Sequence, residues 1–385
     1  MQCGNNLKQL SLAVHNFHDT HDRLPSFQDD PLFATKRFWR ASWLYTLLPF
    51  IEQTPLFDGI MATGANGVSD GQWEFGSRIG SLRSTWISTF ICPSDNNSSV
   101  WIFDGSNSEA SATKTNYRGS MADMVVRADA DNRSSSPRSW LRNGPLTPVA
   151  PAPGNTAGAN SGFNRVSRHA GLIGIETITD GTSNTVLITE GVIYDGATHD
   201  TWAVDFRANL LQAALFYNAI PNECLRLKGT GRRSLTQAQA QAMGISNARS
   251  HGNNADVRMG WRAYDTRWNW GVAVFTLLPP NSPSCRNSSW GGASASSEHS
   301  GGVQAALADG SVRFISDTIH TKNLGIAARG SGGAHVPQGE SHDNWVPATP
   351  IANTTGGTDA VAGSSFSYGV WAELGAINDG SATSF

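Results

Sequence analysis

The stretch GNNLKQLSLAVHNFH, residues 4–18, decides how this chain of 385 residues begins to fold. Apolar residues recur in it at spacings of three and four: Leu7, Leu10, Val14 and Phe17. This spacing places them on one face of an α-helix, with polar residues on the other faces. Pro25 follows and ends the helix, because the residue before a proline is disfavoured in the helical conformation. We therefore predict a helix that buries one face against another layer of the protein.

The start of this helix has no cap-like lead-in, because Met1 lies almost directly against it. We expect residues 1–25 to be the C-terminal half of a longer helix whose first half lies upstream. The chain contains no run of 18 apolar residues, so we do not expect the printed sequence itself to cross a membrane.

The rest of the chain changes from helical to strand-like periodicity. Helical patterns dominate up to about residue 95, with a kink expected at Pro49 and a further helix over 77–90. Beyond that point short apolar runs alternate with Gly, Asn, Asp, Ser and Pro clusters, the pattern of β structure with long loops. We treat residues 1–385 as one domain with these parts after the first helix: a helical segment (26–95), a β-rich region (96–325) with an insertion at about 205–250, a loop insertion (326–366) and a C-terminal edge segment (367–385).

Two segments of the β-rich region have clear strand and turn signals. Residues 172–190 predict a strand, a turn and a second strand. Residues 302–316 place Asp309-Gly310 between two alternating runs, which favours a two-residue hairpin turn with positive φ at both central positions. The fold class that we predict is α+β: a long N-terminal helix packed on an antiparallel β-sheet with long loops.

Charged residues are sparse in this chain. Asp, Glu, Lys and Arg make up 15% of it, against roughly 25% in ordinary globular domains, and the net charge is -3. This balance argues against a nucleic-acid partner or an anionic membrane surface. Abundant small polar residues and 13 Trp favour a loop-rich extracellular β protein over a helical cytosolic enzyme.

The four cysteines are far apart in sequence: Cys3, Cys92, Cys224 and Cys285. No two of them form a CxxC pair, which argues against a zinc ribbon or a thioredoxin-type motif. An even number allows two disulfides in three connectivities. Spacing alone leaves disulfides and buried free thiols equally open.

The sequence contains no familiar catalytic motif, since neither GxSxG nor HExxH occurs. Ser294, His299 and Asp309 do supply the residue types of a catalytic triad within sixteen positions. Asp309, however, has a backbone reason to occupy a hairpin turn. We therefore predict no catalytic residues and interpret the chain as non-enzymatic, with an extracellular hydrolase as the weaker alternative.

Binding sites are suggested at two places. Asp129 and Asp131 offer hard oxygen ligands for calcium, but the 12-residue loop pattern that makes calcium binding specific is absent. We favour a solvated loop there and predict no other cofactor. Trp261, Trp268 and Trp270 lie close in sequence, and their flat faces suit sugar stacking. Packing in the core of a large β domain is the competing and preferred interpretation.

Several motifs follow one another in order over nearly the whole chain. They are the opening MQCGNNLKQL, CPS (92–94), TNY (115–117), ITDGTSNT (178–185), LPPNSPSC (278–285), the spacing His299-x9-Asp309-Gly310 and GVW (369–371). This set resembles a bacterial family of prepilin-type, type IV pilin-like proteins, abundant in planctomycete-type bacteria, whose signature is His-x9-Asp-Gly. The chain departs from the family at its end, where NDGS (378–381) stands in place of a Gly-Gly-Glu ending.

The resemblance implies an apolar half-helix upstream. This segment would anchor the subunit in the cytoplasmic membrane and then pack against copies of itself or other pilin-like subunits in a filament. The implied function is that of a non-catalytic pilin-like or pseudopilin subunit at the cell surface. A cell-surface solute- or glycan-binding module is the alternative. Export also implies disulfides, for which we expect the pairs Cys3–Cys92 and Cys224–Cys285.

Overall fold

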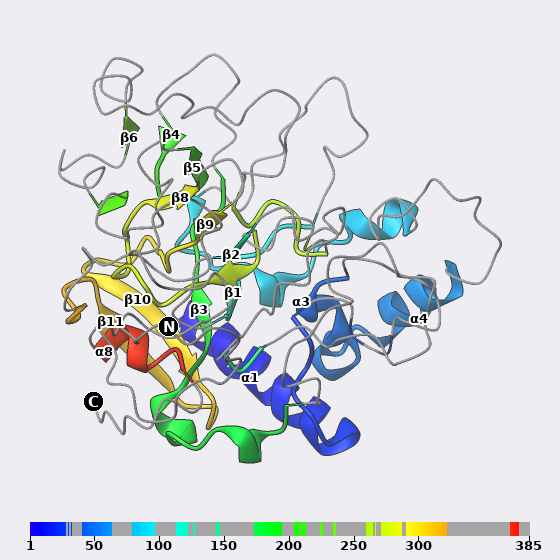
Figure 1. Ribbon diagram of the computed structural model, residues 1–385. Coiled ribbons are helices and arrows are strands. Elements are labelled where there is room, and N and C mark those ends of the chain that lie inside the picture. Colours follow the sequence, from blue (N-terminus) through cyan, green and yellow to red (C-terminus); the bar gives the residue numbers. More distant parts are fainter. Residues whose placement is uncertain are drawn as a thin grey trace, which may run out of the picture.

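The structure is a computed structural model that describes part of the chain (Figure 1). The described residues are 1–27, 30, 32, 41–63, 79–96, 113–121, 126–127, 144–146, 173–194, 204–208, 210–212, 224–225, 234–235, 259–264, 266, 271–286, 290–321 and 370–376. The insertion at 326–366 and most of the insertion at 205–250 lie outside them. No helix among these residues is both long and apolar enough to cross a membrane.

The predicted first helix is confirmed as α1 (Gln2–His21). It ends because Asp22 adopts a left-handed conformation, with φ of 53°, and donates its backbone N–H to the His18 carbonyl. The helix therefore stops before Pro25 is reached. Burial of each large apolar side chain stabilises the fold by about 1.5–3 kcal/mol. The buried face comprises Cys3, Asn6, Leu7, Leu10, Ser11, Ala13, Val14 and Phe17.

A five-stranded sheet receives this face of α1, in the strand order β11-β10-β3-β1-β7. Neighbouring strands pair antiparallel except β1 and β7, which pair in parallel at one edge. The α+β class is confirmed, but the sheet is mixed rather than purely antiparallel. The strands are β1 (Tyr117–Ser120), β3 (Val186–Glu190), β7 (Ala273–Val274), β10 (Gly302–Leu307) and β11 (Val312–Ser316).

The two faces of this sheet are covered by different elements. Side chains alternate along β10, so that Gln304 and Ala306 face α1. The opposite face packs against the short helix α8 (Val370–Glu373), whose Trp371 donates its indole N–H to the Leu278 carbonyl at 2.8 Å. In Figure 1, α8 lies beside β10 and β11 although it follows them by more than fifty residues. The sheet is thus a middle layer between two helices.

The predicted hairpin is confirmed, but its turn differs from the expected type. Gly310 has φ of 82° and donates its N–H to the Leu307 carbonyl, whereas Asp309 is not among the residues with positive φ. The loop is therefore a type I turn over Ala308 and Asp309, followed by glycine in the left-handed region. Only one position requires positive φ, and glycine occupies it.

Two sequence-based predictions of secondary structure are wrong. The helix expected over 77–90 is two 3-10 turns, η2 (Gly80–Ser84) and η3 (Ser88–Phe90). Between them lie the β-branched residues Thr85 and Ile87, both extended, and such residues disfavour helix. The strand expected before β3 is the 3-10 turn η8 (Ile175–Thr177), where Ile175 donates its backbone N–H to the His18 ring at 3.2 Å. This segment covers the end of α1 instead of joining the sheet.

The remaining elements surround this core. The expected kink occurs at Pro49, where the helical segment divides into α3 (Trp43–Thr46), η1 (Leu48–Ile51) and α4 (Thr54–Thr63). Another 3-10 turn, η9 (Thr182–Asn184), precedes β3. A four-stranded sheet contains β2 (Val126–Arg127), β9 (Trp290–Gly292), β8 (Ser284–Arg286) and β5 (Leu210–Gln212), and a two-stranded sheet contains β4 (Val204–Asp205) and β6 (Ser234–Leu235).

The packing of α1 predicts opposite outcomes for two leucines two positions apart. Leu10 is fully buried and Leu12 is 60% exposed. Leu10→Ala removes buried methyl groups and leaves a cavity, so it should lower the free energy of unfolding by about 2–5 kcal/mol. Leu12→Ala should change it by less than about 0.5 kcal/mol. Urea unfolding of the disulfide-bonded protein measures both, and equal effects would contradict the described orientation of the helix.

Candidate functional site

The two disulfides have the pairing that the resemblance implies. Cys3–Cys92 joins the first turn of α1 to the segment after η3, and Cys224–Cys285 joins the region around residue 224 to β8. Disulfides persist in oxidising compartments and are rare in the cytosol. The pair of bridges therefore indicates a secreted or extracellular protein.

A glutamate–histidine pair lies against the first of these bridges. Glu190 ends β3 with its side chain on the α1 face of the sheet, and that side chain is 1% exposed. Its Oε1 atom lies 3.1 Å from His299 Nε2, and its Oε2 atom accepts the backbone N–H of Gln304 at 2.8 Å. His299 is 22% exposed and forms the solvent side of the pair. Cys92 Sγ lies 4.0 Å from both Oε1 and Nε2, so the pair adjoins the disulfide.

Opposing forces act on the Glu190 carboxyl group. Burial raises its pKa above the ordinary value, because the charged form loses hydration. The hydrogen bond from Gln304 and the nearby His299 act in the opposite direction, and the net direction is upward. A buried carboxylate of this kind depends on its partner for compensation.

A second group of buried polar residues positions Cys92. Its backbone N–H donates to Asn116 Oδ1 at 2.9 Å. The Asn116 amide in turn donates to Asp95 Oδ2 at 2.6 Å, and the same carboxylate oxygen accepts the Ile193 backbone N–H at 2.8 Å. Asp95, only three residues after Cys92, is thereby linked to the chain just after β3. The loop that carries Cys92 is held against the sheet by side-chain hydrogen bonds to β-strand ends.

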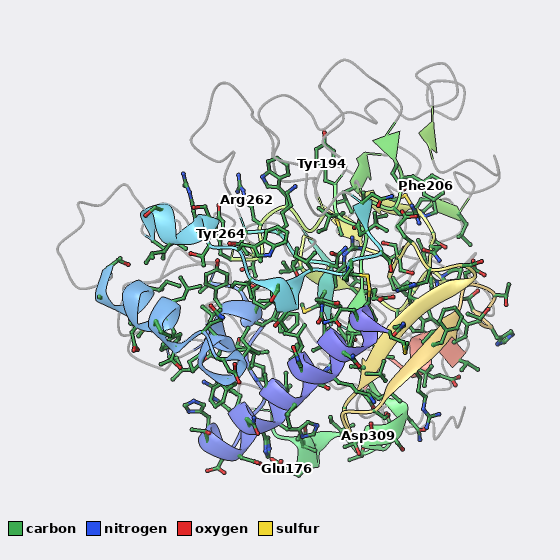
Figure 2. All side chains as sticks on the ribbon, turned by 180° about the vertical axis from the view of Figure 1, so that it is seen from behind. Glu176, Tyr194, Phe206, Arg262, Tyr264 and Asp309 are labelled. Atoms are coloured by element: carbon green, nitrogen blue, oxygen red, sulfur yellow. A yellow bond between two sulfur atoms is a disulfide. The ribbon has the colours of Figure 1, made fainter. Side chains whose placement is uncertain are left out.

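The structure does not bring together Ser294, His299 and Asp309, the three residues whose types could form a catalytic triad. His299 precedes β10 and Asp309 follows it, and a strand of six residues alone separates its ends by roughly 20 Å. Asp309 accepts the backbone N–H of Ser311 in the hairpin turn, and Figure 2 shows it at the turn end of the β10–β11 hairpin. Ser294 donates its hydroxyl to the Pro283 carbonyl. The carboxylate partner of His299 is Glu190, which sequence reasoning missed.

The sequence around Glu190 contains a weak indication that this residue is functional or paired. Residues 186–190 read VLITE, so a carboxylate ends a strand whose five residues are all buried. Glutamate is almost never fully buried unless it is paired. Its partner lies 109 residues away in sequence, so the strand alone does not identify it.

The other predicted ligand residues do not gather at this site. Trp261 is 3% exposed, with its ring edge-on to Tyr194 at 5.9 Å and the Lys114 ammonium 5.8 Å from its centroid. Its face is therefore unavailable as a sugar platform, and the core-packing interpretation holds for this residue. The remaining ligand predictions lie outside the described residues: Trp268, Trp270, Asp129 and Asp131.

Removing the histidine of the buried pair should destabilise the fold. His299→Ala leaves the Glu190 charge buried without its partner, which should cost about 1–3 kcal/mol at neutral pH, less than a fully buried pair because His299 is partly exposed. His320→Ala, at an exposed histidine, is the matched control and should be near neutral. Urea unfolding compares the two variants, and equal stabilities would show that the pair contributes nothing.

The raised pKa of Glu190 predicts how stability varies with pH. Above the ordinary pKa of 4.5, the folded state retains a proton that the unfolded state has lost. The stability linked to this residue is therefore complete below that pH and is lost as pH rises through the raised pKa. In Glu190→Gln this loss is absent, so the unfolding free energy should decline less from pH 4.5 to neutrality. Denaturant series at several pH values test this, and identical slopes for both proteins count against it.

The comparisons with known proteins identify a family but no activity. A family model described as "Protein of unknown function (DUF1559)" matches residues 1–322. Searches of curated proteins and of solved structures find no significant match. The matched range includes α1, the five-stranded sheet and both disulfides. The chain therefore belongs to this family of proteins of unknown function, DUF1559.

Proposed function

We propose that the chain is a non-catalytic, pilin-like subunit at the cell surface that acts by assembly and surface presentation. One observation carries the proposal: α1 lies along the sheet with one face buried and the other exposed, and it is held at both of its ends. The Cys3–Cys92 bridge holds its first turn. Near its last turn, His18 accepts the backbone N–H of Ile175.

A helix held in this way is suited to transmit force between a membrane or filament and the rest of the subunit. In the pilin-like family that the sequence resembles, an apolar half-helix precedes this segment. Such a half-helix must be buried, first in the bilayer and then against other subunits, because exposed apolar surface is unfavourable in water. The exposed face of α1, with Leu12 at its middle, would then lie toward neighbouring subunits.

The chemistry of the buried polar groups also supports a structural role. Glu190 accepts the Gln304 backbone N–H and contacts the His299 ring. The Asn116 amide donates to Asp95 and to the Gly191 carbonyl, and Asp95 also accepts the Ile193 backbone N–H. The hydroxyl and carboxylate of the sequence triad, Ser294 and Asp309, each bond to a backbone group. Within the described part of the chain, these groups link loops and strands of the same subunit.

Electron microscopy of cells that express the native gene tests the proposal. We expect regular surface fibres that contain this protein. Leu12→Asp should reduce fibre number strongly while leaving the unfolding free energy of the purified protein within about 0.5 kcal/mol, because Leu12 is exposed. Trp86→Asp changes another exposed apolar residue, 55% exposed and outside α1, and is the matched control that should leave fibres unaffected.

Two results would overturn the proposal. One is a protein that stays monomeric on the cell surface and never forms fibres. The other is equal loss of fibres in the Leu12 and Trp86 variants, since the exposed face of α1 would then have no special part in assembly.

A further inference from the structure

The side chains around the Cys3–Cys92 bridge have the composition of a zinc site. Cys3, Cys92, Glu190 and His299 each offer one ligand atom, and these atoms all lie within 4.8 Å of one another. Thiolate, imidazole and carboxylate groups are the ligands that zinc uses in proteins. We propose that these four residues bind one zinc ion when the disulfide is reduced to two thiols. The inference is independent of assembly into a filament.

The distances suit tetrahedral coordination. Zinc bonds of about 2.0–2.3 Å place neighbouring ligand atoms roughly 3.3–3.8 Å apart. His299 Nε2 and Glu190 Oε1 are 3.1 Å apart, and Cys92 Sγ is 4.0 Å from each. Three ligand atoms thus need only small shifts, of about half an ångström or less, to reach the geometry. The fourth, Cys3 Sγ, becomes available when its bond to Cys92 Sγ opens and the sulfurs separate.

The surroundings hold each ligand residue in place, as the outer shell of a metal site does. The Gln304 bond to Oε2 leaves Oε1 of Glu190 turned toward His299. Three of the four residues are almost completely buried, and His299 forms the edge through which an ion enters. The positioning bonds are Gln304 N–H to Glu190 Oε2 (2.8 Å), Cys92 N–H to Asn116 Oδ1 (2.9 Å), the Tyr117 hydroxyl to the Cys3 carbonyl (3.2 Å) and His299 N–H to Ser297 Oγ (3.1 Å).

The chemistry balances with one reductant. A dithiol supplies two electrons and two protons to the Cys3–Cys92 bond, which becomes two thiols, while the dithiol becomes a disulfide. Zn²⁺ then replaces the two thiol protons, which leave to solvent, and two zinc–sulfur bonds form. Glu190 Oε1 and His299 Nε2 complete the tetrahedron, with the imidazole proton on Nδ1. The ion also compensates the negative charge of the buried Glu190 carboxylate.

The consequence is that α1 is attached to the segment that carries Cys92 in both redox states. In the oxidised state a covalent bond joins Cys3 to Cys92. In the reduced state a zinc ion joins the same two residues and adds bonds to β3 and to the segment before β10. The attachment of the helix therefore survives reduction where zinc is present and fails where it is absent.

Metal titration of the full chain tests the proposal. The double variant Cys224→Ser/Cys285→Ser retains only the relevant pair of cysteines. It is reduced anaerobically with a phosphine, which forms the phosphine oxide, and is then titrated with Zn²⁺ against a chromophoric chelator and with Co²⁺. We expect one ion per reduced chain, none per oxidised chain, and visible cobalt bands typical of tetrahedral coordination with thiolates. His299→Ala and Glu190→Gln should each weaken zinc binding at least about tenfold, and His320→Ala should not.

Other results would overturn it. The first is that the reduced chain binds no stoichiometric zinc. The second is that the affinity for zinc is unchanged in both the His299 and Glu190 variants, because two thiols alone would then bind the ion. If reduction unfolds the chain, circular dichroism gives the answer. Refolding on addition of Zn²⁺ supports the site, since metal binding then supplies folding free energy, and failure to refold excludes it.

Discussion

The packing of α1 on the sheet is the interaction on which the other features depend. Its apolar face covers the central strands β10 and β3 and forms one core cluster with apolar residues of α3 and η1. Because the helix runs along the sheet, it brings its first turn to one end of β10 and its later turns to the other. Both the Glu190–His299 pair and the hairpin turn are therefore placed relative to this one helix.

Glu190 and Arg118 are buried on opposite faces of the sheet, and both have hydrogen-bond partners. On the α1 face, Glu190 is paired with His299. On the other face, the Arg118 guanidinium is fully buried and donates to the carbonyls of Ser294 and Val192. Burial lowers the pKa of Arg118 to about 9, and the charge of Asp95 opposes that shift. These groups tie loops to strand ends at positions where apolar residues would leave backbone carbonyls and N–H groups without partners.

The spacing His299-x9-Asp309-Gly310 has a structural explanation. Two residues, the six residues of β10 and the first residue of the turn separate the histidine from Asp309. The histidine reaches the Glu190 pair beside Cys92, and Gly310 approaches His15 on α1. The motif therefore marks the two ends of one strand under one helix. The strand holds its histidine and aspartate apart, at opposite ends of β10.

Local sequence patterns were sufficient to predict the helices and strands that are specified by residues close together in the sequence. The 3.6-residue period of residues 4–18 predicted α1, and alternation around Asp309-Gly310 predicted the β10–β11 hairpin. The expected helix over 77–90 failed because Thr85 and Ile87 prefer extended backbone, a local preference that the apolar pattern concealed. The pairing of cysteines followed from family resemblance and not from spacing, since spacing leaves three connectivities open.

The amino-acid sequence by itself determined the first helix, the hairpin and the α+β class, because periodicity and turn chemistry act over short distances. Only the tertiary structure decided that Glu190, and not Asp309, is the partner of His299, and that both meet the Cys3–Cys92 bridge. Residues 3, 92, 190 and 299 come together through the order of strands in the sheet and the path of α1 across it. That arrangement depends on long-range packing, which no local pattern records.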